Sequence, residues 1–208
     1  MIFNLYIQVI AGVFSRPFRR REFFEQIYFV ANKSLPIVLF CVSFAAVVTI
    51  LESSFHMKLV IQNDSMVPGF AALLILRELG SVVTALLLTS RIGAGWASEI
   101  GSMQVTEQVD ALKMLGIDPI KYLIVPRFLA SLLGTMILTA LANIVCIFCA
   151  MLVSKYYLGY TSEMFITSMN RFVDFKDLVF AIIKGGFFGA VIPIVAGYFG
   201  FRCKAGAD

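Results

Sequence analysis

Charged residues are scarce in this chain of 208 residues: they make up 14% of it, against 60% hydrophobic residues. A soluble domain usually carries about 25% charged and about 45–50% apolar residues. So little polar surface excludes water as the solvent for most of the chain and indicates lipid instead. The length allows one membrane domain of a few spans and excludes a sizeable soluble domain beside it.

Residues that commonly carry catalytic or metal chemistry are equally sparse. The single histidine, His56, stands alone, so we expect no histidine-based metal site. Cys41 and Cys203 lie in or beside apolar segments, and Cys146 and Cys149 form a CxxC inside a long apolar run without a second pair. We interpret these cysteines as small hydrophobic packing residues. No GxxxxGK[ST] loop is present, so we expect no ATP hydrolysis by this chain, no catalytic residue and no bound metal.

Four apolar segments approach the roughly 20 residues that a helix needs to cross a bilayer. They are separated by polar or aromatic stretches. The sequence therefore predicts an all-α polytopic membrane protein, a single domain over residues 1–208. Its transmembrane helices are predicted at residues 34–51, 67–88, 128–153 and 178–201.

The segments outside these spans differ in character. Residues 1–33 place an arginine cluster after a short apolar stretch, the reverse of a signal peptide, which favours an interfacial helix on anionic headgroups. A frayed terminus is the alternative. Residues 52–66 are a short polar connection. Arg91 to Arg127 form a long polar excursion, which is helix-like over residues 91–118. Residues 154–177 mix Tyr and Phe with charges, as expected of an interfacial segment on the outer side.

Lysine and arginine collect in the cytoplasmic loops of membrane proteins. Basic residues concentrate at both ends of this chain and in its central excursion, which predicts that both termini and residues 91–118 are cytoplasmic. The residues on the predicted cytoplasmic side are Arg16, Arg19, Arg20, Arg21, Lys33, Arg91, Lys113, Lys121, Arg127, Arg202 and Lys204, against Lys58, Lys155, Arg171 and Lys176 on the other side.

Charges also occur inside the predicted spans. Arg77 lies roughly 14 Å from the outer end of its span at 1.5 Å per residue, near the midplane of a core of about 30 Å. A charge there costs on the order of 2.5–3.5 kcal/mol, so it needs a partner or a water-filled cavity. Adjacent helical residues diverge, so Arg77 is not expected to neutralise Glu78, for which Lys184 is a candidate partner. The charges either line a polar cavity or form an ion network between helices without ligand contact.

The excursion has a helical pattern. Val105, Val109 and Leu112 follow i, i+4, i+7 spacing on one face, whereas Glu107 and Asp110 fall on another. Gly116 and the Asp118–Pro119 pair supply a stop. Such a short amphipathic helix either docks a soluble partner or rests on the headgroups.

The run from Leu76 to Arg127 is LRELGSVVTALLLTSRIGAGWASEIGSMQVTEQVDALKMLGIDPIKYLIVPR. It closely resembles the characteristic sequence of the MlaE family, the permease subunits of ABC-type lipid transporters associated with MCE-domain proteins. The pieces LRELG, SRIGAG, SEIGSMQVTEQVDAL and MLGIDPIKYLIVPR match in order and without gaps, and a weaker resemblance extends over essentially the whole chain.

The resemblance implies roles for particular residues. The polar helix after the second span would be the coupling helix that docks on a cytoplasmic ATPase, over Glu99 to Leu115. Its implied contacts are Glu99, Gln104, Glu107, Asp110 and Leu112. Arg77, Glu78 and Gly80 match the family's ELG motif; Arg77 and Glu78, with Lys184, are the intramembrane charges identified above. The structural motif residues are Gly80, Arg91, Gly93, Gly101, Asp118, Pro119, Pro126 and Arg127.

Partners and location follow from the same resemblance. It implies a homodimer that holds lipid between its two copies, an ABC ATPase dimer that binds the ATP and Mg²⁺, an MCE-domain protein and, in some relatives, a STAS-domain subunit. Phospholipid is the usual substrate class of the family, with sterols and other lipids among relatives. The implied location is the bacterial inner membrane, with an organellar inner envelope as the alternative, and no nucleic-acid partner is expected.

The chain departs from the family pattern in two places. Family members usually have proline after ELG, where this chain has Ser81. They also continue past the position of Asp208 into a fifth span, so we expect either a truncated chain or a naturally short one. A non-transporting scaffold subunit is therefore an alternative to a permease. An intramembrane lipid-modifying enzyme is disfavoured, because no nucleophile accompanies Glu78 and Lys184.

Overall fold

The computed structural model describes residues 2–13, 20–60 and 66–203, and these contain helices but no β-strand. Four helical runs in this part are long and apolar enough to cross a membrane: Arg21–Met57, Val67–Val105, Ile120–Tyr156 and Phe175–Gly200. The predicted all-α polytopic class is confirmed. Arg16, Arg19 and Lys204 of the predicted charge distribution, and the chain end at Asp208, lie outside the described residues.

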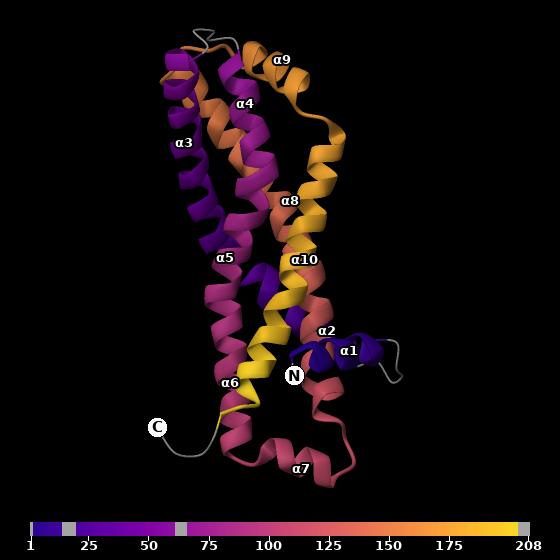
Figure 1. Ribbon diagram of the computed structural model, residues 1–208. Coiled ribbons are helices and arrows are strands. Elements are labelled where there is room, and N and C mark those ends of the chain that lie inside the picture. Colours follow the sequence, from indigo (N-terminus) through magenta and orange to yellow (C-terminus); the bar gives the residue numbers. More distant parts are fainter. Residues whose placement is uncertain (1, 14–19, 61–65, 204–208) are drawn as a thin grey trace. The chain divides into compact units, whose positions relative to one another are not determined.

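Several runs combine α-helical with π-helical segments, the latter labelled η (Figure 1). The elements in chain order are α1 (Ile2–Val13), α2 (Arg20–Ile27), η1 (Tyr28–Asn32), α3 (Leu35–Val60), α4 (Val67–Leu74), η3 (Ile75–Val83), α5 (Thr84–Leu88), η4 (Thr89–Gly93), α6 (Ala94–Val105), α7 (Gln108–Met114), η5 (Ile120–Ile124), α8 (Val125–Tyr156), α9 (Ser162–Phe172) and α10 (Phe175–Gly200).

The helices divide into two compact units. The first unit comprises residues 1–34, 86–135 and 186–208, and the second unit comprises residues 35–85 and 136–185. Helices α8 and α10 contribute residues to both units.

In the second unit, helix α3 is apolar all round, as expected of a helix in lipid. Val38, Val42 and Ala46 recur every fourth position and are fully buried, whereas Phe40 and Phe44 are exposed. One face of α3 therefore packs against protein, and the aromatic face is left for lipid.

The buried stripe of α3 receives a cysteine from α8. Cys146 is buried, and its thiol donates a hydrogen bond to the Val42 carbonyl over 3.3 Å. All four cysteines are free. Cys146 therefore acts as a small packing residue, as the sequence predicts.

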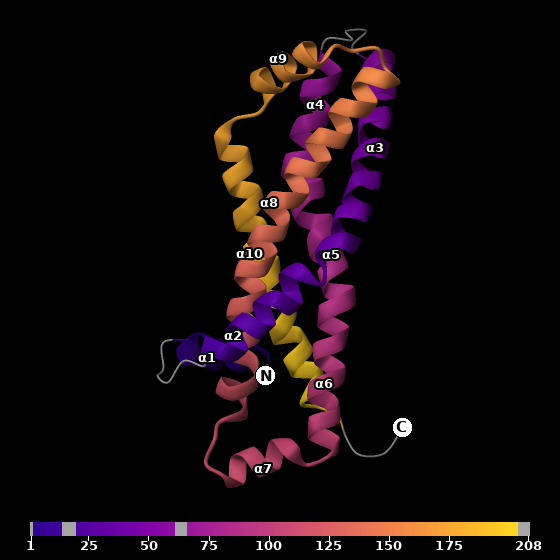
Figure 2. The same ribbon diagram turned by 180° about the vertical axis from the view of Figure 1, so that it is seen from behind.

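Helix α9 lies across the end of α4 in the same unit (Figures 1 and 2). Phe165 is buried, and the Ser168 hydroxyl accepts a hydrogen bond from the Gly69 amide at 3.0 Å. A side chain at Gly69 would overlap Phe172 and Ser168, so the close approach of α9 requires glycine there. The aromatic segment predicted at residues 154–177 thus contains an amphipathic helix fixed to the second span.

The first unit has its own apolar core. It is built from α1, α6, α8 with the preceding η5, and α10, through Leu5, Val9, Ile100, Phe128 and Ile194 among others. The described part of the N-terminal region is therefore helical rather than frayed.

Three helical runs extend further than the predicted spans. Helix α3 reaches Val60, past the expected end at Leu51, so the first part of the predicted polar connection is helical. The run that starts at Val67 stays helical to Val105, past Leu88, and α8 covers Val125–Tyr156, where residues 128–153 were expected. The Arg91 side chain donates a hydrogen bond to the Lys33 carbonyl, so a charged residue there is accommodated without ending the helix.

Candidate functional site

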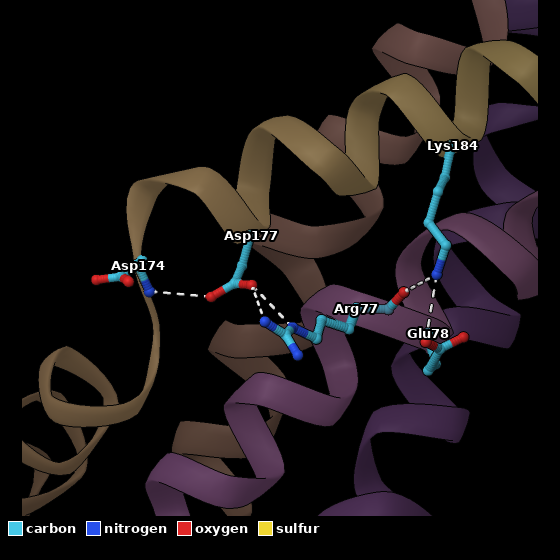
Figure 3. Close-up of polar contacts among 5 residues, drawn as sticks. All are labelled: Arg77, Glu78, Asp174, Asp177 and Lys184. Carbon is cyan, nitrogen blue, oxygen red and sulfur yellow. Dashed lines mark hydrogen bonds and ion pairs between the residues drawn. The ribbon is translucent and has the colours of Figure 1, made fainter.

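Arg77 lies on η3 and reaches Asp177 in the first turn of α10 (Figure 3). Its Nε and Nη2 atoms each lie 2.8 Å from the Asp177 Oδ1 atom. The other carboxylate oxygen, Oδ2, accepts a hydrogen bond from the Asp174 amide at 3.0 Å. Asp177 is thereby held by backbone and side chain together.

Lys184, further along α10, forms the second contact between these elements. Its Nζ atom donates to the Arg77 carbonyl oxygen at 2.8 Å and to Glu78 Oε1 at 3.2 Å (Figure 3). The predicted pairing of Glu78 with Lys184 is confirmed. Arg77 and Glu78 point to different partners, as their adjacent positions on a helix predict.

These four residues, Arg77, Glu78, Asp177 and Lys184, form the charged cluster. Sequence reasoning missed Asp177, because it was placed just outside the fourth span. Its spacing was the available signal: Asp177 and Lys184 are seven positions apart, two helical turns, and so share one face of α10. The cluster thus joins one face of α10 to two successive residues of η3.

The backbone that carries Arg77 and Glu78 is π-helical over Ile75–Val83. Such segments are rare and frequently occur at functional sites. Gly80 lies inside this segment, and a Cβ atom there would overlap the Asn143 carboxamide of α8. The motif glycine is therefore required by the close approach of α8 to the segment.

Asn143 also belongs to a group of buried polar side chains in the second unit. Within the described residues, its amide atoms and the hydroxyls of Ser81, Thr84 and Thr139 have no hydrogen-bond partner. Buried polar groups in proteins are nearly always paired, often through ordered water. Hydrogen-bonding capacity therefore accompanies the charged cluster within the apolar spans.

The side chains of the charged cluster differ in their exposure to solvent. The Asp177 side chain is 8% exposed, whereas those of Arg77, Lys184 and Glu78 are 59%, 41% and 61% exposed. Bare charges facing hydrocarbon near the midplane cost on the order of 2.5–3.5 kcal/mol each. The exposed side of this cluster is therefore suited to water or a polar ligand.

The predicted coupling region forms two helices, α6 and α7, instead of one continuous helix. The chain turns between them at Thr106 and Glu107, and Glu107 adopts a left-handed conformation with φ of 58°. Figures 1 and 2 show α7 running crosswise to α6. Val105 therefore does not continue the face of Val109, which is buried.

Glu99, an expected docking residue, lies on α6 and pairs with Arg127 near the start of α8, at 2.9 Å. The Arg127 side chain is only 5% exposed, and that of Glu99 is 55% exposed. The pair lines a small cavity of about 200 Å³ that also contains Glu22 of α2. Beside it, the Trp96 ring N–H donates to Gln26 of α2 at 3.1 Å. Polar contacts thus tie α2, α6 and α8 together within the first unit.

The remaining predicted docking residues lie on or near α7. Asp110 is exposed and pairs with Lys113 at 2.7 Å, while Glu107 is exposed in the turn. Gln104 lines a cavity in the first unit, and Leu112 is half-buried.

Sequence reasoning did not single out the end of α7. Met114 is 90% exposed and Leu115 74% exposed, and both lie outside the candidate spans. Exposed apolar side chains beside polar ones are typical of a docking surface for another protein.

The remaining motif residues lie where helices approach each other closely or near the start of helical segments. A Cβ atom at Gly93 would lie 3.3 Å from Ile192, and one at Gly101 2.8 Å from the Cys203 sulfur. The Asp118 carboxylate accepts a hydrogen bond from the Ile120 amide at 3.0 Å. Pro119 precedes η5, and Pro126 lies just after the junction of η5 with α8, inside the helical run Ile120–Tyr156.

Known proteins resemble the chain over nearly all of its length. The family model described as Permease MlaE matches residues 23–208. A probable ABC transporter permease protein of Rickettsia felis is 32% identical over 206 residues, which cover 99% of this chain and 79% of that protein. The intermembrane phospholipid transport system permease protein MlaE of Haemophilus influenzae is 30% identical over 199 residues, with coverage of 94% and 76%. The chloroplastic protein TRIGALACTOSYLDIACYLGLYCEROL 1 of Arabidopsis thaliana is 32% identical over 200 residues, with coverage of 96% and 57%.

Proposed function

This chain belongs to the MlaE permease family and is a multi-pass ABC transporter permease, and from that premise we propose that it moves phospholipid as part of a larger complex. The name of the Haemophilus influenzae relative, which specifies intermembrane phospholipid transport, supports the substrate class. The proposed location is the bacterial inner membrane, with both termini and α7 on the cytoplasmic side.

The exposed side of the charged cluster is the observation that carries the proposal. A network that only holds helices in register would seal its charges between them, yet three of the four side chains stay open. Arg77 and Lys184 offer cationic donors to a phosphate, and Glu78 offers an acceptor to a headgroup ammonium or hydroxyl. Asp177 positions Arg77 for this task.

The energy for transport comes from a separate subunit in this proposal, since no phosphate-binding loop is present in the sequence. An ATPase dimer docks on the end of α7, where Met114 and Leu115 supply apolar contact and Asp110 and Lys113 a charged rim. A second copy of this chain lies opposite the exposed side of the charged cluster and leaves a water-accessible space between them, and an MCE-domain protein passes the lipid on. A STAS-domain subunit is a further proposed partner.

Transport is tested by reconstituting the chain with its proposed ATPase partner and following a fluorescent phospholipid between liposomes. We expect ATP-dependent transfer that falls at least tenfold in Arg77→Gln and Lys184→Gln. The matched control is Lys155→Gln, an exposed lysine outside the cluster. Full transfer by the cluster variants would contradict the proposed lipid site.

Docking is tested separately by copurification of the ATPase in detergent. Met114→Asp combined with Leu115→Asp should lose the ATPase, because apolar contact is replaced by two carboxylates. Glu107→Lys combined with Asp110→Lys tests the polar residues predicted from the sequence. Retention of the ATPase by both double variants would place docking elsewhere.

A further inference from the structure

A cavity of the first unit shares no lining residue with the charged cluster. It has a volume of about 550 Å³ and lies among α1, α7, η5 and the end of α10. Leu5, Val109, Ile120 and Phe201 give it apolar walls. Ligand pockets typically measure about 300–1,000 Å³ and combine such walls with a few polar groups.

A cation without a carboxylate partner stands at the edge of this cavity. Arg202 stacks on the Tyr198 ring, with 5.0 Å from its guanidinium carbon to the ring centroid, and its Nη1 atom donates to the Tyr198 hydroxyl at 2.6 Å. Among the described residues, no carboxylate oxygen lies within ion-pair distance of Arg202. Its charge is therefore available to an anion.

Two further charged residues line the cavity, and both have local partners. Lys113 pairs with Asp110, which leaves the ammonium two further donors. Asp118 accepts a hydrogen bond from the Ile120 amide. Among the described residues that line the cavity, Arg202 is thus a cation without a carboxylate partner, and Lys113 is a cation that shares its charge with Asp110. The Asp118 carboxylate is the acidic group of this lining, and it already accepts a hydrogen bond from the Ile120 amide.

The cavity also lies where apolar helices end. One candidate span ends at Val105, another begins at Ile120 and a third ends at Gly200, so Arg202 comes immediately after a span. Basic pockets at the ends of transmembrane helices recognise phospholipid headgroups, and tyrosine is enriched at this level. The apolar walls and the basic edge therefore match the two ends of one molecule.

We propose that this cavity binds a membrane phospholipid, with an acyl chain against Leu5, Val109 and Phe201 and the phosphate on Arg202 and Lys113. This site is separate from the charged cluster, and the lipid in it is held, not transported. Because Val109 and Lys113 belong to α7, the bound lipid fastens α7 to α1 and to the end of α10.

The test uses phosphatidylglycerol with a diazirine at the end of one acyl chain, added to the purified chain in detergent. After illumination, labelled peptides are located and quantified by mass spectrometry. We expect labelling of peptides that contain Leu5, Val109 and Phe201. Unlabelled phosphatidylglycerol should compete at least tenfold better than diacylglycerol, which lacks the phosphate, and inorganic phosphate alone should not compete.

Variants assign the label to the cavity. Arg202→Gln and the cavity-filling Val109→Phe should each lower it at least tenfold, and Arg202→Lys should retain much of it. Arg171→Gln, an exposed arginine of α9, is the matched control and should leave it unchanged. Because Val109 is buried, circular dichroism and the melting temperature establish that Val109→Phe is folded, and Arg202→Gln tests the same site from an exposed position.

Unchanged labelling in Arg202→Gln, or equal competition by diacylglycerol, would overturn the proposal. Lys184→Gln separates it from the proposed function. That variant should reduce transport and leave the label at Val109 intact, so each proposal fails on its own measurement.

Discussion

Two arginine–carboxylate pairs with nearly the same distance, one in each unit, are built in opposite ways. In the second unit Arg77 lies 2.8 Å from Asp177, and the carboxylate is buried while the arginine is mostly exposed. In the first unit Arg127 lies 2.9 Å from Glu99, and the arginine is buried while the carboxylate is half-exposed. The buried partner of each pair is fixed, and only the exposed partner is free to meet a ligand or another subunit.

The two pairs therefore present opposite charges at their exposed sides: the cation Arg77 in one pair and the carboxylate Glu99 in the other. Arg77 presents a cation at its exposed face, which suits a phosphate. Arg127 is sealed among α2, α6 and α8, so its charge serves the packing of the first unit. The two arginines therefore differ in their surroundings: Arg77 is mostly exposed, and Arg127 is buried.

The largest expected effect comes from leaving the buried arginine without its partner. Glu99→Leu leaves the buried Arg127 guanidinium without its carboxylate partner. Removing one partner of such a pair lowers the free energy of unfolding by about 3 kcal/mol. We expect a clear loss of melting temperature in detergent, measured by circular dichroism.

Arg127→Met and the double variant test whether the loss of stability comes from the buried arginine that Glu99→Leu leaves without a partner. Arg127→Met removes the buried charge and frees a half-exposed carboxylate, so it should cost about 1 kcal/mol. The double variant should be more stable than Glu99→Leu alone. If Glu99→Leu is the milder single change, Arg127 does not depend on that carboxylate.

An intermediate effect is expected at the buried carboxylate of the charged cluster. Asp177→Asn weakens the hydrogen bonds to Arg77, and hydrogen bonds to charged groups contribute roughly 1.5–3 kcal/mol. Because Arg77 is mostly exposed and remains solvated, we expect the free energy of unfolding to fall by about 1.5 kcal/mol. Transport should be reduced as well. Asp174→Asn, which changes an exposed side chain in the same turn, should melt like the native chain.

The smallest effect on stability is expected at Lys184, whose contact with Glu78 is open to solvent. Exposed ion pairs contribute about 0–1 kcal/mol, so Lys184→Gln should melt within a degree or two of the native chain while transport falls. Lys184→Arg keeps the charge and should restore much of the transport. A large drop in melting temperature would mean that Lys184 is structural and that the charged cluster, like the Arg127–Glu99 pair, serves packing.

The sequence predicts the helical class and the Glu78–Lys184 contact because apolar length and the cost of an unpaired charge are local properties. It does not predict the length of α3 or of the run to Val105, because a charged residue limits an apolar span without ending the helix: Glu52 and Arg91 are good helix formers, and both helices continue past them. The sequence also does not predict the turn that divides α6 from α7. That turn depends on a left-handed backbone at Glu107, a conformation that is usually signalled by glycine.

Tertiary contacts decide the site residues in the same way. Glu99 reads as a surface carboxylate in the sequence, and only the fold brings it to Arg127. Asp177 reads as a residue of the outer segment, yet it begins α10 and reaches Arg77. Met114 and Leu115 become visible as an exposed apolar tip only once Gly116, with φ of 74°, turns the chain away.

In the proposed function, the exposed side of the charged cluster meets water or a lipid headgroup inside the membrane. The most direct measurement replaces the four native cysteines, places a single cysteine at Glu78 or Lys184, and follows its modification by a charged, membrane-impermeant thiol reagent in the assembled complex. Phe44→Cys, on the lipid-facing side of α3, is the reference. We predict that cysteines at positions 78 and 184 react readily and that the one at position 44 does not. Equal protection at all three positions would contradict the claim.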